Sequence, residues 1–177
     1  MADLKIALVG NPNAGKTTLF NALTGSRQHV GNWPGKTVEC KQGLFRFRGK
    51  EIEVTDLPGT YSLTAYSEEE IIARDYILFE KPDVVVAVVD ATNLERNLYL
   101  VVQVLELQVP MILALNMSDR VRSLDYEIDE NGLSKYLGDT PVIPMCAKRR
   151  EGLGKLREEI MSLAETNEPV PWKKVPS

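Results

Sequence analysis

Short apolar runs recur along the chain and predict the strands of a buried sheet. Four of these runs are continuously apolar, which is typical of parallel strands covered on both faces. A fifth segment alternates apolar and polar residues, turns at Arg48-Gly49-Lys50 and leads into a sixth, which indicates a hairpin. The predicted strands cover residues 4–9, 38–47, 51–56, 84–89, 111–115 and 142–144.

Between these runs, apolar residues recur at intervals of three and four, the spacing of one helix face. Gly25 ends the first predicted helix, and the acidic start of the second suits a helix N-terminus. Residues 26–37 and 57–67 are predicted loops. The predicted helices cover 16–24, 68–79, 94–107, 129–137 and 153–164, and 118–123 allows a further short one.

Strands that alternate with helices after one hairpin predict an α/β fold. We expect a six-stranded, mostly parallel sheet with one antiparallel strand and helices on both faces. Ligands of such sheets bind outside the carboxyl ends of the strands. Ligand-binding residues are therefore expected where the predicted strands end.

The first strand ends in G-x-x-x-x-G-K-T, and a helix follows at once, as a phosphate-binding loop requires. Glycines let the backbone approach a ligand, and the loop N–H groups with the helix N-terminus favour an anion. Lys16 should reach the β- and γ-phosphates, and the Thr17 hydroxyl should bind Mg²⁺. The predicted nucleotide contacts here are Gly10, Asn11, Pro12, Asn13, Ala14, Gly15, Lys16, Thr17 and Thr18. A glycine-rich turn that merely contains a lysine is the alternative.

A second motif, Asp56-Leu57-Pro58-Gly59, stands at the end of the third predicted strand. A carboxylate there can hold Mg²⁺ through a water. Gly59 lets a backbone N–H approach the γ-phosphate, so the loop can sense whether that phosphate is present. The motif is weak alone, but its place about 40 residues after the phosphate loop strengthens it.

The third motif, Asn116-Met117-Ser118-Asp119, follows the strand at 111–115. The Asp119 carboxylate can accept hydrogen bonds from guanine N1 and its 2-amino group, a pair that adenine does not offer. We expect Asp119 to select GTP over ATP and Asn116 to brace the phosphate loop. After the last strand, Cys146-Ala147-Lys148 is a weaker candidate for backing the base. The Ala147 N–H would bind guanine O6 and Lys148 would lie on the base.

Residues 28–37 occupy the place of a first switch loop. Thr37 is the candidate for the second protein hydroxyl on Mg²⁺, with Gly35 and Lys36 beside it. Alternatively, Thr37 only opens the next strand. Trp33 is either a surface anchor or a lid over the nucleotide.

Composition narrows the function classes. The chain has 177 residues, is 44% hydrophobic and carries a net charge of −4, so its bulk charge does not favour nucleic acid. No apolar run is long enough to insert into a bilayer, and Cys40 and Cys146 form no C-x-x-C pair. We expect a GTPase domain over 1–166 and a proline-rich linker over 167–177.

With these motifs in order, the chain resembles Ras-like P-loop GTPases, and among them the N-terminal domain of the FeoB ferrous iron transport proteins. The specific stretches are LTGSRQ at 23–28, VGNWPG at 30–35, DLPGTYSL at 56–63 and VDATNLERNLYL at 89–100. Two positions differ from common sequence patterns. Lys36 stands where the family has a small apolar residue, and Met117, normal for FeoB, replaces the lysine of most GTPases.

The resemblance implies more than the residues do. It implies that the chain is part of a longer polypeptide, continuing into a helical domain and a transmembrane permease, and that it lies at the cytoplasmic face of a bacterial or archaeal inner membrane. A homo-oligomer is possible on the same basis. It also implies K⁺ beside the phosphates, bound by the Asn13 side chain and the carbonyls of Gly31 and Trp33; otherwise Asn13 only tightens its loop.

The residue after D-x-x-G is Thr60, so no glutamine amide is available to orient water, and slow intrinsic hydrolysis is expected. The main hypothesis is therefore a GTP/GDP- and Mg²⁺-binding GTPase that regulates an iron permease, assisted by K⁺ or by a charge from Lys36. A soluble GTPase of RNA maturation and a nucleotide sensor without turnover are the alternatives.

Overall fold

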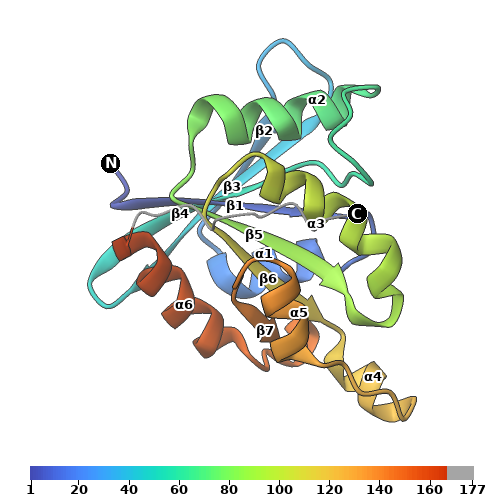
Figure 1. Ribbon diagram of the computed structural model, residues 1–177. Coiled ribbons are helices and arrows are strands. Elements are labelled where there is room, and N and C mark those ends of the chain that lie inside the picture. The colour runs from blue at the N-terminus through green and yellow to red at the C-terminus, as the bar shows by residue number, and fades with distance from the viewer. Residues whose placement is uncertain (167–177) are drawn as a thin grey trace.

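The computed structural model describes residues 1–166, and the linker predicted at 167–177 lies outside this range. Within it, seven strands form one sheet in the order β2-β3-β4-β1-β5-β6-β7 (Figure 1). The strands are β1 Leu4–Gly10, β2 Gln28–Asn32, β3 Glu39–Phe47, β4 Lys50–Asp56, β5 Val84–Asp90, β6 Met111–Asn116 and β7 Val142–Pro144. Only β3 runs against its neighbours, so the predicted α/β class with one antiparallel strand is confirmed.

The helices cover both faces of the sheet, as Figure 1 shows. One apolar cluster joins the sheet to α1 and α6 and includes the fully buried Phe20 and Leu156. A second cluster on the opposite face joins it to α2, α3, α4 and α5. The helices are α1 Lys16–Thr24, α2 Glu68–Asp75, α3 Leu94–Glu106, α4 Ser118–Ser123, α5 Glu130–Tyr136 and α6 Leu153–Thr166.

Two predicted elements were wrong in detail. Residues 28–32, predicted as loop, form the edge strand β2, which pairs with β3, so the sheet has seven strands rather than six. All five β2 residues are exposed, so no apolar alternation marked the strand. The predicted helix 68–79 is α-helical only to Asp75 and continues as a π-helical turn over Tyr76–Glu80.

The predicted sites meet at one edge of the sheet. The phosphate loop follows β1, and β4 and β5, which pair with β1 in parallel, end beside it. β6 pairs with β5 in parallel and β7 with β6, so all three carboxyl ends point the same way. Within residues 1–166, no helix combines the length and the apolar character that crossing a bilayer requires.

Candidate nucleotide site

The phosphate loop depends on glycine at both ends. A Cβ on Gly10 would stand 2.6 Å from the Val88 carbonyl oxygen, because β1 and β5 lie closely side by side there. Gly15 has a φ of 90°, and a Cβ on it would stand 2.1 Å from Asn116 Nδ2. The loop therefore turns tightly against the Asn116 side chain. It leads directly into the N-terminus of α1 at Lys16, where an anion would be favoured.

Lys16 and Asp56 form a buried ion pair between the phosphate loop and the end of β4. Side-chain exposure is 9% for Lys16 and 7% for Asp56, so little solvent screens the pair. Thr17 and Thr18, on the first turn of α1, are exposed. The structure thus places the candidate phosphate-binding lysine beside the candidate metal-binding carboxylate, a pairing that the sequence motifs did not predict.

Asn116 joins the phosphate loop to the loop after β7. Its Nδ2 donates to the Ala14 carbonyl over 3.0 Å, and its Oδ1 accepts from the Ala147 N–H over 3.0 Å. The side chain is 4% exposed, and a buried amide with both ends bonded is held rigidly. The predicted bracing role is what the geometry provides. However, the Ala147 N–H, predicted to donate to guanine O6, is instead occupied by Asn116 in this structure.

Asp119 stands on the first turn of α4, next to the loop after β7. Met117 takes a left-handed conformation with φ 62°, and the Ser118 N–H donates to the Met145 carbonyl over 3.0 Å. Desolvation opposes the charged form of Asp119, but hydrogen bonds from the Cys146 thiol and from backbone N–H groups prevail and lower its pKa. Asp119 is therefore held as a carboxylate, the form that accepts two hydrogen bonds. Lys148 is exposed nearby on the same loop as Cys146.

The segment after β4 lies against the phosphate loop. The Leu57 N–H donates to the Leu8 carbonyl over 3.0 Å, and the Thr60 N–H donates to the Gly10 carbonyl over 3.1 Å. A Cβ on Gly59 would stand 3.3 Å from Pro12, so a larger residue would crowd the loop. Thr60 is 3% exposed and its hydroxyl has no partner within the protein. This hydroxyl is buried rather than presented to a ligand.

The predicted first switch forms a hairpin whose tip, residues 33–38, lies beside α2 (Figure 1). Gly35, Lys36 and Thr37 are exposed at this tip. The Trp33 carbonyl, predicted as a K⁺ ligand, accepts a hydrogen bond from the Lys36 N–H over 2.9 Å, and Gly31 pairs with Cys40 in the sheet. Within residues 1–166, no hydrogen bond or ion pair joins Thr37 to Thr17 or Asp56, so these three candidates are not assembled together here.

The chain matches the family model described as ferrous iron transport protein B over residues 4–160. That is most of the chain, and it includes all the motifs described above. The chain belongs to this family, FeoB.

The relatives agree with this assignment. The chain is 52% identical over 161 residues to the Fe(2+) transporter FeoB of Salmonella typhimurium, covering 89% of this chain and 21% of that protein. It is 47% identical over 163 residues to the Fe(2+) transport protein A/Fe(2+) transporter FeoB fusion protein of Porphyromonas gingivalis, covering 92% of this chain and 19% of the other. The chain spans about a fifth of the length of these relatives.

Solved structures extend the likeness to the fold. The FeoB G-domain of Methanococcus jannaschii matches with a TM-score of 0.82 and 48% identity, over 93% of this chain and 99% of that one. The cytosolic domain of L. pneumophila FeoB matches with a TM-score of 0.90 and 43% identity, over 97% of this chain and 67% of that one. The fold of this chain is therefore that of a FeoB G domain.

Helix α3 contributes site residues that the sequence marked only as part of a FeoB-specific stretch. Asn97 is buried, and it accepts from the Asp90 N–H over 3.2 Å and donates to the Asn93 carbonyl over 2.8 Å. The Arg96 guanidinium lies 4.7 Å from the centre of the Tyr61 ring. These residues border a polar cavity of about 210 Å³ next to the phosphate loop, lined by Asn11, Pro12, Asn13, Ala14, Tyr61, Asp90, Asn93, Arg96 and Asn97.

Glu70 is a second residue that sequence reasoning missed. Its carboxylate accepts from the Thr64 hydroxyl over 2.8 Å and from the Ser62 hydroxyl over 3.1 Å, while its N–H donates to the Ser67 hydroxyl over 3.1 Å. The spacing Ser67-x-x-Glu70 was a readable helix-capping signal. Here the glutamate turns toward the preceding loop, residues 57–67, and fixes it to the start of α2. This loop after D-x-x-G is called the second switch below.

Proposed function

We propose that this chain is the GTP-binding and GTP-hydrolysing domain of a ferrous iron transporter, and that its nucleotide state regulates or gates transport by the rest of the polypeptide. The proposal rests on the two hydrogen bonds that the Asn116 side chain makes. One buried side chain holds the phosphate loop and the loop after β7 in a common frame, with Asp119 at its margin. A frame of this kind suits a ligand with phosphates at one end and a guanine at the other.

The relatives supply the transport part of the proposal. They are Fe(2+) transporters, and the T. maritima FeoB cytosolic domain was solved in GDP and GMPPNP forms. The remaining partners follow from this: a helical domain and a transmembrane permease in the same polypeptide, and a possible homo-oligomer. On this basis the domain works at the cytoplasmic face of the membrane.

The donor set near the phosphate loop fits Mg²⁺, which prefers oxygen ligands. Thr17 offers an exposed hydroxyl, and Asp56 a carboxylate that acts through a water; Thr37 joins them when the hairpin moves. Mg²⁺ held by these residues would supply positive charge to offset the negative charge on the β- and γ-phosphates. Lys16 leaves Asp56 for the same phosphates, and the Gly59 N–H approaches the γ-phosphate.

K⁺ fits the same site only after the hairpin rearranges. The Asn13 side chain is exposed on the phosphate loop, but the Trp33 carbonyl is committed to its turn. The residues that would hold a monovalent cation are Asn13, through its amide oxygen, and Gly31 and Trp33, through their carbonyls once these are free of the sheet and the turn. The ion would supply positive charge beside the phosphates, at a site where Thr60 offers no side-chain amide.

Single-turnover hydrolysis of GTP with Mg²⁺ tests the proposal. We expect slow phosphate release that is faster in KCl than in NaCl at equal ionic strength, and a difference that disappears in Asn13→Ala. GDP affinity of Asn13→Ala is measured in both salts as well, so that a loss of nucleotide binding is distinguished from a loss of turnover. Equal rates in both salts would contradict the role of K⁺. No phosphate release in either salt would contradict the GTPase and leave a nucleotide sensor.

A further inference from the structure

Unpaired polar atoms gather on the segments around the nucleotide site. Within residues 1–166, four buried side-chain atoms have no hydrogen-bond partner in the protein. Three of them are Asn11 Oδ1 in the phosphate loop, Trp33 Nε1 in the hairpin and Thr60 Oγ1 after β4. Because an unpaired buried polar group costs free energy, each of these segments is held in place by other contacts.

Two contacts join the hairpin to α2 and to the π-helical turn that follows α2. The Trp33 and Tyr76 rings meet edge to face, with centroids 5.7 Å apart and planes at 73°. At the tip, Lys36 Nζ lies 3.8 Å from Glu68 Oε1. The ion pair is half exposed and weak, so the aromatic contact is the main one.

Tyr76 presents a fixed surface to Trp33 because a hydrogen bond ties Tyr76 to the sheet. Its hydroxyl lies 3.0 Å from the Thr55 hydroxyl, which accepts from Gln42 Nε2 over 3.1 Å. Burial raises the pKa of Tyr76, so its hydroxyl stays protonated and available for the bond to Thr55. The contact therefore ties the hairpin to the body of the domain through β3 and β4.

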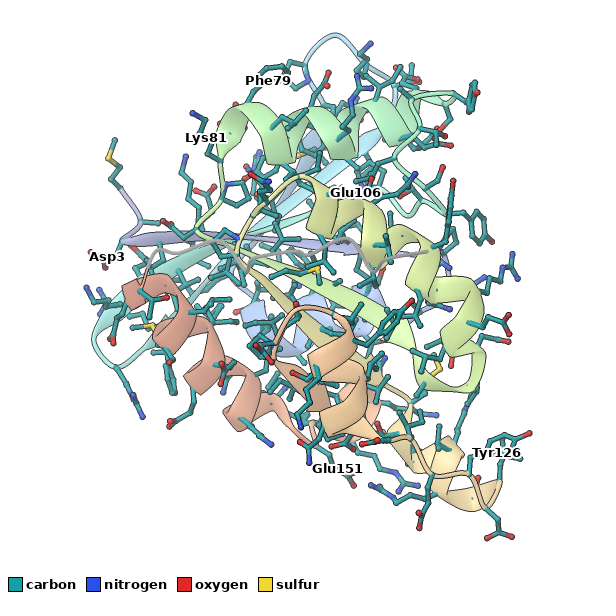
Figure 2. All side chains as sticks on the ribbon, viewed as in Figure 1. Asp3, Phe79, Lys81, Glu106, Tyr126 and Glu151 are labelled. Carbon is teal, nitrogen blue, oxygen red and sulfur yellow. The ribbon has the colours of Figure 1, made fainter. Side chains whose placement is uncertain are left out.

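Open space lies next to the contact between Trp33 and Tyr76. Tyr76 opens the π-helical turn that follows α2, a rare geometry that is frequent at functional sites. A hollow of about 610 Å³ lies between the hairpin and this turn, bordered by Trp33, Tyr76 and Phe79 among others. Figure 2 shows Phe79 at the end of this helical segment, where it is 75% exposed. Because Trp33 leaves its Nε1 unpaired in this place, the contact can be exchanged for another at low cost.

The direction of the hairpin matters for the site. α2 covers one face of the sheet, whereas α1, which carries Thr17, covers the other. A hairpin that packs on α2 therefore keeps Thr37 away from the Thr17 hydroxyl, with which it would share Mg²⁺. We propose that the contact of Trp33 with Tyr76 is a latch that holds the first switch open until GTP with Mg²⁺ draws Thr37 to the site.

This inference rests on the proposed function and adds a regulatory element to it. If only the unlatched fraction of molecules can close over GTP, the latch lowers the apparent affinity for GTP by that fraction. GDP, which has no γ-phosphate to recruit Thr37, is not affected. The latch thus makes the free domain favour GDP.

Variants at Tyr76 test the latch. In Tyr76→Leu, which keeps apolar bulk but removes the ring, we expect affinity for a non-hydrolysable GTP analogue with Mg²⁺ to rise about threefold to tenfold. GDP affinity should stay within about twofold. In the matched control Tyr76→Phe, which keeps the ring and loses only the hydroxyl, the ratio of the two affinities should remain close to the parent's. An unchanged or lowered ratio in Tyr76→Leu would overturn the latch.

Trp33 fluorescence gives a second test that does not depend on how Tyr76→Leu folds. The chain has two tryptophans, so Trp172→Phe leaves Trp33 as the only one. We expect its emission to change when the Mg²⁺-bound GTP analogue is added and to stay constant with GDP. The same emission with both nucleotides, while both bind, would overturn the latch and leave the proposed function standing. Binding of neither would overturn the proposed function itself.

Discussion

Single residues fix the shape of the phosphate loop. Gly15 is the sharpest case, because its φ of 90° and the 2.1 Å approach of Asn116 Nδ2 both exclude a side chain. In Gly15→Ala we expect GDP affinity to fall at least about tenfold and the free energy of unfolding to fall by about 1–3 kcal/mol, from backbone strain and displacement of Asn116. Fluorescent GDP titration and denaturant unfolding measure the two effects.

The chain offers a matched control for this substitution. A Cβ on Gly154, in α6, would meet nothing within 4 Å, and its backbone is not left-handed. Gly154→Ala should therefore leave GDP affinity unchanged and stabilise the helix by about 0.5–1 kcal/mol. Equal losses in both variants would mean that Gly15 is not special.

Glu70 gives the second switch a dependence on pH. The hydrogen bond from Thr64, helped by those from Ser62 and Tyr66, lowers the pKa of Glu70 below its ordinary 4.5. A group whose pKa is lowered by folding stabilises the fold above its ordinary pKa, and that contribution is lost as the pH falls through the lowered value. The parent should therefore unfold at higher denaturant than Glu70→Gln at pH 7, and the gap should narrow as the pH falls below the ordinary pKa of 4.5 and through the lowered one.

Glu69→Gln is the control for charge, because Glu69 is exposed on the same helix turn. Its unfolding curve should stay near the parent's over the same pH range. A gap for Glu70→Gln that does not narrow as the pH falls below 4.5 would show that the carboxylate form is not what holds the loop.

At the scale of elements, α3 anchors the second switch. Leu63, 7% exposed, packs in the cluster that contains α3, and its N–H donates to Gln103 Oε1 over 2.6 Å. Arg96, seven residues before Gln103 and so on the same side of the helix, lies over Tyr61. The segment after D-x-x-G is therefore tied to α3 at two points.

Hydrogen exchange tests this anchor. In Gln103→Ala the Leu63 amide loses its acceptor, so its exchange should speed up by about tenfold while amides in β1 and β5 keep their protection. Gln103→Glu retains an acceptor oxygen and should exchange more slowly than Gln103→Ala. Unchanged protection at Leu63 in Gln103→Ala would mean that packing alone holds the segment.

The elements also show where sequence reasoning worked and where it could not. The apolar runs of β1, β5 and β6 and the glycine-bounded loop were readable, because burial on two faces and left-handed turns leave clear residue signatures. β2 was not readable, since its five exposed residues owe their conformation to pairing with β3. Likewise, α3 looked like an apolar core helix, and the roles of Asn97 and Gln103 depend on loops that only the fold brings to them.

In the molecule as a whole, two groups of structural elements surround the candidate site. The frame that we propose for base and phosphates lies at the carboxyl ends of the strands, where Asn116 donates a hydrogen bond to the phosphate loop. The hairpin, α2 and the segment after β4 lie together and carry two of the unpaired polar atoms. The residues of this frame all belong to motifs that are readable in the sequence. The contact of the hairpin with α2 was beyond them, because Trp33 and Tyr76 are 43 residues apart and neither belongs to a nucleotide motif.

We propose that Asn116, Asp119 and the phosphate loop form one site for guanine nucleotides. The most direct test is displacement of a fluorescent GDP from the chain, with Mg²⁺, by unlabelled GDP and ADP. We predict that GDP displaces the probe at concentrations lower than ADP by about 10³-fold or more, because a site built to bond the guanine edge rejects a base that lacks it. Asp119→Ala should remove most of that difference by weakening GDP. Equal displacement by ADP and GDP in the parent would contradict the account.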